Sequence, residues 1–424
     1  MAIVINGSGT VTGLAVGGLP DGTVDSGTIA TGTIVDADVA NVAASKLTGA
    51  LPAISAASLT NVPLRPSASP LIINGAMNVA QRGTSFTHAN SNTNNWTVDR
   101  LNINTGSIGE YTSTQETLTS GAAFEAGFKK AARIDCTTAV ASPDAGDYFY
   151  AEYKVEAQDC SAFKKGTSAA ETMTVAFWVK SNKTGTGQLN VRDNDNNRMC
   201  SGTYTISSAD TWEHKVINIA ADTTGAFNND NGIGYSFEFW LGSGSTYSSG
   251  TAPTAWETKA GGDRNAAGTL NINDNTSNDW AITGLQVEVG TYTLATLPPF
   301  QHRSVGEELA LCQRYYAVKR MDTSTGGGHF AMGQCNTSTR LDCVVYFPQT
   351  MRLNHGTSIT FDTATDYRIQ SAGTLYVCSA IGGESSSPDS AILYATSSGM
   401  TAGRAGVLIV AANSPVDIKF DAEL

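Results

Sequence analysis

Aromatic and hydrogen-bonding side chains alternate with apolar ones along three segments of the chain, 173–180, 188–192 and 235–240. Successive side chains of a strand point to opposite faces, so each segment would present one polar face. Aromatic rings stack on sugar rings, while amide, carboxylate and guanidinium groups bond sugar hydroxyls. If the three strands share one sheet surface, it is a predicted glycan-binding face of six residues: Trp178, Lys180, Asn190, Arg192, Glu238 and Trp240. The alternative is that these side chains pack under loops or against a partner chain.

Cleavage of a glycan would need two carboxyl groups facing each other across a groove. Glu213 and Glu238 are the candidates, because each has a tryptophan within two positions. Nothing in the sequence pairs them in space. We therefore expect binding without catalysis and assign no catalytic residue.

Motifs for other chemistries are missing from the sequence. It holds no Gly-Lys dipeptide, no GxGxxG, no GxSxG, and no HxH or HExxH among its five histidines. Asp193, Asp195 and Asn197 copy half of a calcium loop, but Arg198 and Tyr204 stand where that loop needs glycine and glutamate, which favours a polar hairpin turn. Seven cysteines without a CxxC pair indicate single buried thiols. We expect no metal and no cofactor.

The charge balance disfavours two classes of partner. Asp and Glu number 38 against 26 Lys and Arg, a net charge of -12, which repels phosphate backbones and anionic lipids. No apolar stretch approaches the ~20 residues of a membrane span. The N-terminus also lacks the pattern of a secretory signal. We expect folding in a cytoplasm, no nucleic acid and no membrane insertion.

The N-terminal segment, residues 1–65, differs in composition from the rest. It has no aromatic residue, and Gly-Thr-Val or Gly-Thr-Ile recurs at 22, 27 and 32, a period of five. A repeat this short can bury its Val and Ile side chains only against other copies of the same segment, which predicts a homo-oligomer. A disordered linker is the alternative.

Residues 66–300 indicate an antiparallel sandwich of the jelly-roll kind. Strands of period-two alternation are separated by Asn, Asp, Gly and Ser turns, with no long helical pattern. The clearest strands are predicted at 148–155, 173–180, 188–192, 214–219, 235–240 and 280–289.

A short amphipathic helix is expected between this domain and the next. The capping box Ser304–Glu307 opens it, a helix is predicted over 304–319, and 301–325 forms a helical linker. Residues 326–424 then form a C-terminal β domain, with strands at 341–347, 374–378, 391–395, 406–411 and 416–423. In the last strand, Ile418, Phe420 and Ala422 should point inward. The predicted fold class is all-β.

Four segments resemble bacteriophage tail-fibre and receptor-binding proteins: Leu71–Ser85, Trp96–Arg100, Ala281–Gly290 and Glu307–Tyr316, the last ending in Gln-Arg-Tyr-Tyr. The middle domain is also similar to carbohydrate-binding-module jelly rolls. The resemblance implies a homotrimeric virion appendage, attached to tail or adaptor proteins through residues 1–65 and exposed to the extracellular medium.

The resulting hypothesis is a structural fibre protein that binds a host-surface glycan non-covalently during phage adsorption. Two alternatives stay open: a glycan depolymerase of a phage tail, and a head-fibre or decoration protein without receptor binding.

Overall fold

The computed structural model of the chain describes residues 4–5, 11–12, 70–88, 94–321, 328–353, 358–411 and 416–424. Two compact units divide the chain, Met1–Val62 and Pro63–Leu424. In the first, β1 (Val4–Ile5) pairs antiparallel with β2 (Val11–Thr12). The Gly-Thr repeats at 22–34 lie outside the described residues. No helix in the described ranges combines the length and apolar character needed to cross a membrane.

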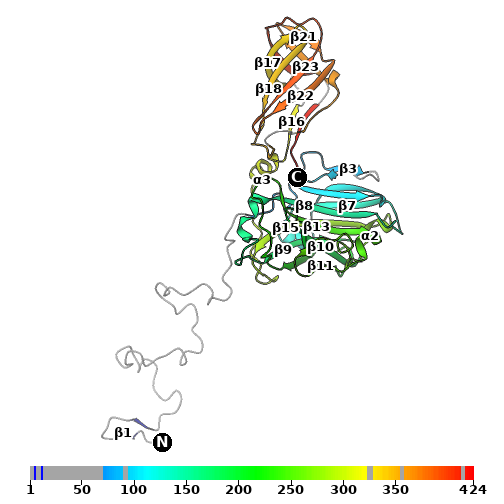
Figure 1. Ribbon diagram of the computed structural model, residues 1–424, viewed down its shortest axis with the longest axis vertical. Coiled ribbons are helices and arrows are strands. Elements are labelled where there is room, and N and C mark those ends of the chain that lie inside the picture. The colour runs from blue at the N-terminus through cyan, green and yellow to red at the C-terminus, as the bar shows by residue number, and fades with distance from the viewer. Residues whose placement is uncertain are drawn as a thin grey trace. The chain divides into compact units, whose positions relative to one another are not determined.

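The first part of the second unit is a sandwich of two antiparallel sheets, drawn in cyan to green in Figure 1. The six-stranded sheet has the order β12 (Glu213–Ile219), β9 (Met173–Lys180), β15 (Asp279–Val289), β7 (Lys130–Thr138), β6 (Glu110–Thr117) and β3 (Ser85–His88). The seven-stranded sheet has the order β14 (Glu257–Thr258), β11 (Arg198–Ile206), β10 (Gly185–Asp193), β13 (Ile233–Ser243), β8 (Tyr148–Glu156), β5 (Leu101–Gly106) and β4 (Asn94–Trp96). Short helices connect the strands: α1 (Ala122–Glu125), η4 (Ala157–Phe163), α2 (Ser245–Ser248) and η5 (Ile272–Asp274).

The main core lies between these sheets, as the period-two pattern predicts. Phe177 of β9 meets Phe239 of β13 edge to face at 5.0 Å, and both rings are fully buried. Because side chains alternate, Trp178, Glu238 and Trp240 must then lie on the outer faces of their sheets. The fold class and the antiparallel sandwich predicted from the sequence are confirmed.

The C-terminal β domain, yellow to red in Figure 1, has its own core. A seven-stranded sheet has the order β21 (Thr374–Val377), β20 (Tyr367–Ser371), β24 (Ala405–Val410), β17 (His329–Thr337), β18 (Arg340–Tyr346), β23 (Ser390–Thr396) and β22 (Ala380–Ser386). A three-stranded sheet has the order β16 (Tyr316–Met321), β25 (Val416–Asp421) and β19 (Ser358–Phe361), and η6 (Ala364–Asp366) precedes β20. Ile418, Phe420 and Ala422 are buried, which confirms the predicted inward face.

The helix between the domains is shorter than predicted. The predicted capping box at Ser304 and Glu307 is present, but α3 (Val305–Gln313) ends six residues before the expected limit of 319. Tyr316 instead begins β16, because its backbone pairs with Asp421 of β25. The segment predicted as a helical linker therefore also supplies a strand of the C-terminal domain.

Charged side chains connect the end of the chain to the sandwich. Arg100 is buried, forms an ion pair with Glu423, and lies 3.5 Å from the centre of the Tyr315 ring. Arg82 lies 3.4 Å from the centre of the Tyr316 ring and bonds Asp421 at 3.1 Å. These contacts combine charge pairing with cation–π attraction.

All seven cysteines are buried free thiols, as the odd count without a CxxC pair predicts. The segment Asp193–Asn197 is a hairpin turn, as predicted, with Asn197 at a φ of 51°. Lys165 lies 2.6 Å from the carboxylate of Asp193, so this acid already has a cationic partner.

Candidate functional site

An aromatic groove lies on the outer face of the six-stranded sheet. Trp178 of β9 stands directly opposite His214 of β12, and their rings stack at 4.6 Å with 6° between the planes. The groove has a volume of about 360 Å³ and opens to solvent. This is within the range of small-molecule sites.

A glycine brings the rings of the groove together. Gly284 of β15 has a φ of +63°, which L side chains rarely adopt, at a shift in register between Thr283 and Gln286. A Cβ atom at Gly284 would stand 2.7 Å from Phe128 Cζ and 3.0 Å from Trp178 Cδ1. Glycine therefore fits both the backbone conformation and the close approach of the two rings.

A second group of rings forms the wall of the groove. Phe128, Phe300 and His302 contact one another with ring centres 4.8 to 5.1 Å apart. Phe300 and His302 come from the irregular segment after β15, whose Pro298 carbonyl accepts a hydrogen bond of 2.9 Å from Gln286 Nε2. Gln286 thus fastens this wall to the sheet, and Leu294, 58% exposed, lies at the rim.

The polar groups of the groove are uncharged near neutral pH. Desolvation lowers the pKa of His214 and of His302 below the ordinary 6.5, so both imidazoles are neutral at pH 7. A neutral imidazole offers one N–H donor and one nitrogen acceptor. With the Gln286 amide, the groove can therefore both donate to and accept from hydroxyl groups beside its rings.

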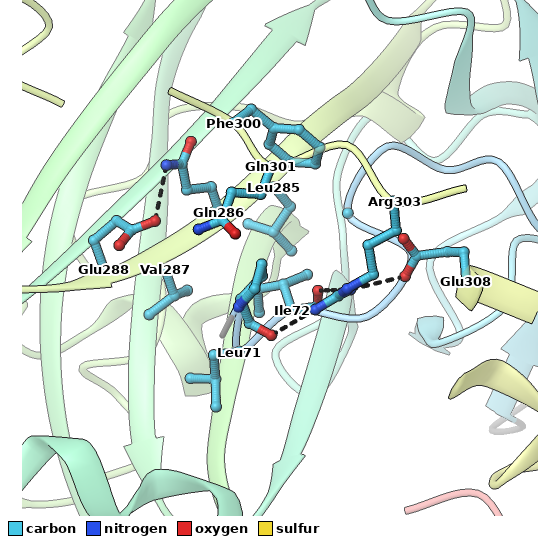
Figure 2. A pocket seen from close by; sticks show the side chains of 12 residues that line it. Leu71, Ile72, Leu285, Gln286, Val287, Glu288, Phe300, Gln301, Arg303 and Glu308 are labelled. Carbon is cyan, nitrogen blue, oxygen red and sulfur yellow. Dashed lines mark hydrogen bonds and ion pairs between the residues drawn. The ribbon is translucent and has the colours of Figure 1, made fainter. Parts of the chain in front are cut away.

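A smaller pocket adjoins the groove and shares Gln286 and Phe300 with it (Figure 2). Its volume of about 20 Å³ suits one water molecule and is too small for a sugar ring. Figure 2 shows Gln286 bonded to Glu288, at 2.9 Å, and burial raises the pKa of that glutamate. Arg303 bonds Glu308 and the Ile72 carbonyl, each at 3.1 Å, and so holds the start of α3 against the sandwich.

The structure does not unite the six predicted binding residues on one surface. Trp178 and Lys180 belong to the six-stranded sheet, whereas Asn190, Arg192, Glu238 and Trp240 belong to the outer face of the seven-stranded sheet. The expectation of a single sheet face is therefore wrong. Strand β9, which carries Trp178, pairs with β12 and β15. Strand β10, which carries Asn190, pairs with β11 and β13.

Within the first group, only Trp178 lines the groove. Lys180 lies on the same outer face, 3.7 Å from the Glu116 carboxylate and 5.4 Å from the centre of the Trp212 ring. Trp212 is buried in a smaller apolar cluster, which also includes Phe128 and has Trp178 and Phe300 packed against it.

The second group packs under a loop, the alternative left open by the sequence. Asn190, Glu238 and Trp240 have no exposed surface. The loop after β14 covers them: the Arg264 carbonyl accepts from Asn190 Nδ2 at 2.7 Å, and the Arg264 guanidinium lies 4.7 Å from the centre of the Trp240 ring.

Glu238 is the centre of this buried network. Its carboxylate accepts from Arg192 Nη1 at 2.6 Å, Arg264 Nη2 at 2.8 Å and Trp240 Nε1 at 3.0 Å. Burial alone would raise the pKa of Glu238, but the charges and hydrogen bonds of Arg264 and Arg192 lower it to about 2. Glu152 stands directly across on β8, and burial raises its pKa. The arrangement therefore holds the Glu238 carboxylate charged inside the protein at neutral pH.

The candidate acid–base pair is not brought together. Glu213 lies on β12 of the other sheet and bonds the backbone N–H groups of Ser207 and Ser208 and the amine of Lys215. Phe128, His214, Phe300 and His302 were not among the predicted site residues. Phe300 and His302 follow Pro298 and Pro299, where no periodic pattern indicates a site.

No protein-family model and no curated protein match this sequence. Several solved structures resemble the fold. An enzymatically active domain of tailspike protein 4 from bacteriophage CBA120 has a TM-score of 0.25 and 11% identity over 52% of this chain, which spans 21% of that protein.

Carbohydrate-binding modules resemble this chain at a similar level. The module TmCBM61, in complex with β-1,4-galactotriose, has a TM-score of 0.24 and 11% identity over 52% of this chain and 99% of its own. A family 11 module from Clostridium thermocellum, in complex with a β-1,3-1,4-mixed-linked tetrasaccharide, has a TM-score of 0.25 and 9% identity over 49% of this chain and 97% of its own. At these TM-scores the likeness carries no information about function.

Proposed function

We propose that this chain binds a glycan non-covalently in the aromatic groove of its sandwich. The observation that carries the proposal is the parallel stack of Trp178 on His214, beside a wall of Phe128, Phe300 and His302. Aromatic faces beside neutral donors and acceptors match a sugar ring, which has an apolar face and hydroxyl groups around its edge.

The lining of the groove favours binding over cleavage. None of the described residues that line it is an aspartate or glutamate, whereas cleavage would use two such groups. The buried pair Glu152 and Glu238 lies on the other sheet, and neither carboxylate is exposed. We therefore propose a binding protein and not a depolymerase.

The biological setting in this proposal is a virion. The resemblance of Leu71–Ser85 and Glu307–Tyr316 to phage receptor-binding proteins supports a fibre that adsorbs to a host-surface glycan. Residues 1–65 would attach it to other virion proteins, and the sandwich would face the extracellular medium.

A homotrimer is part of the same proposal, and one surface supports self-association. The outer face of the C-terminal seven-stranded sheet exposes Met332, Val344, Tyr346 and Ile392, with Met332 and Tyr346 more than 70% exposed. Val344 and Ile392 are cross-strand neighbours, and Met332 and Tyr346 lie on the same face of the sheet. Contiguous apolar patches on a protein surface commonly mark contacts between chains. Light scattering of the full chain tests the proposal, and a mass of one chain would contradict it.

Glycan binding is tested by comparing the full chain and Trp178→Ala on an array of bacterial-surface glycans. Loss of a contact ring at the centre of a site costs about 2 kcal/mol or more, so affinity should fall at least about 30-fold. Phe86→Ala is the matched control, since Phe86 lies on β3 at the far edge of the same sheet and is 36% exposed. Equal binding by the wild type and Trp178→Ala would contradict the proposal.

A further inference from the structure

We infer that the groove accepts a neutral glycan and rejects one that carries carboxylate or phosphate groups. This inference rests on the proposed function and specifies the class of ligand. It follows from the charges in and around the groove.

The lining itself supplies no fixed charge. Apart from its aromatic rings and the Gln286 amide, the groove is lined by described residues that are aliphatic, glycine or proline, including Leu294, Leu297 and Pro298. The two imidazoles are neutral at pH 7, because desolvation lowers the pKa of each. Gln286 donates through Nε2 to Glu288 and to the Pro298 carbonyl, which leaves its Oε1 as an acceptor. Each of these groups suits a hydroxyl.

No lysine or arginine is among the described residues that line the groove. Lys180 pairs with Glu116 at 3.7 Å, Lys215 with Glu213 at 2.5 Å, and Lys129 lies 3.5 Å from the centre of the Phe124 ring. Arg303, beside the adjoining pocket, bonds the Pro70 and Ile72 carbonyls and Glu308. Lys180, Lys215 and Arg303 thus have carboxylate partners. Lys129 contacts only the Phe124 ring, but it does not line the groove.

A carboxylate in this groove would therefore lose water without gaining a counter-charge. Burial of an unpaired charge is among the most costly events in recognition, whereas a hydroxyl is satisfied by an imidazole or an amide. Glu288, next to Gln286, adds repulsion whenever it is ionised. We expect discrimination of at least about tenfold between a neutral sugar chain and its acidic counterpart.

The test uses the full chain on an array of neutral and acidic glycans, with Trp178→Ala in parallel. Every acidic polysaccharide is also presented after chemical reduction of its carboxylates to CH₂OH, which keeps linkage and shape. We expect that glycans whose binding depends on Trp178 are neutral, or bind at least about tenfold better once reduced. Trp178-dependent binding of an acidic glycan that is lost on reduction would overturn the inference and leave the proposed function standing. Absence of any Trp178-dependent binding would contradict both.

A rim substitution tests the cause of the discrimination. Leu294 is 58% exposed, so Leu294→Lys adds a cation with little effect on folding, and Leu294→Gln is the neutral control. Leu294→Lys should bind an acidic glycan at least about threefold more tightly than Leu294→Gln, and the ratio of acidic to neutral affinity should rise with it. If Leu294→Lys and Leu294→Gln bind acidic glycans equally, the lack of a cation is not the reason that the groove excludes acidic glycans.

Discussion

Replacement of Glu238 by glutamine should destabilise the sandwich by about 3 kcal/mol at pH 7. Glutamine keeps the shape of the side chain but removes the charge that Arg192 and Arg264 bond. The carboxyl pKa falls from an ordinary 4.5 to about 2 in the folded protein, and about 1.4 kcal/mol for each pH unit gives about 3 kcal/mol. Removal of one partner from a buried ion pair costs a similar ~3–5 kcal/mol.

The pH dependence of the stability difference between wild type and Glu238→Gln tests whether the charge of Glu238 is its cause. A lowered pKa means that the carboxylate stabilises the fold above about pH 4.5, and that this contribution disappears as the pH falls toward 2. The difference between wild type and Glu238→Gln should therefore shrink over that range. Part of the loss at pH 7 should be offset, because the charge of Glu238 raises the pKa of Glu152 and its removal relieves this repulsion.

Urea unfolding followed by tryptophan fluorescence measures the unfolding free energy of the sandwich. All six tryptophans, at 96, 178, 212, 240, 256 and 280, lie in the sandwich. Glu171→Gln is the control: its pair with Lys164 at 2.6 Å is exposed and should contribute at most ~1 kcal/mol. A loss below about 1 kcal/mol for Glu238→Gln, or a loss that is the same at pH 7 and pH 2.5, would refute the reasoning.

Two further predictions concern the groove. Gly284→Ala places a methyl group against Phe128 and Trp178 at a backbone conformation with φ of +63°, so it should lower the unfolding free energy by at least about 1 kcal/mol and weaken glycan binding. Urea unfolding and a binding titration check this, and unchanged values in both would contradict the role assigned to the glycine. Binding of a neutral glycan should be constant from pH 8 to about pH 7 and should weaken as His214 and His302 become protonated below 6.5, since each imidazole then loses its acceptor nitrogen. Calorimetric titrations across this range check it, with His214→Gln as a variant whose pH response should be smaller; tighter binding at low pH would contradict the prediction.

The strands were predictable because their cause is local. A strand between a core and another environment must alternate its side chains, and 173–180 does so over the full length of β9. The same rule placed Phe177 inward and Trp178 outward. The helix predicted over 304–319 is too long, because the aromatic residues Tyr315 and Tyr316 suit the apolar stripe of a helix as well as a strand. Only pairing with β25 decides between helix and strand.

The site was only partly predictable, because alternation does not say which strands are neighbours. β9 and β10 are adjacent in sequence yet belong to different sheets, so the polar faces of Trp178 and Asn190 point away from each other. The same pattern cannot show that a loop covers Glu238, since a buried charge network and an exposed polar face use the same residue types. Phe300 and His302 lie in an irregular segment that joins the groove through the Gln286 hydrogen bond and through ring contacts with Phe128, neither of which a periodic pattern indicates.

The most direct test of glycan binding in the groove is a crystal structure of the full chain soaked with a neutral glycan selected on the array. We expect a sugar ring stacked on Trp178, with hydroxyl groups within hydrogen-bond distance of His214, His302 or Gln286. A glycan bound on the C-terminal domain, or on the outer face of the seven-stranded sheet, with the groove empty, would contradict the account.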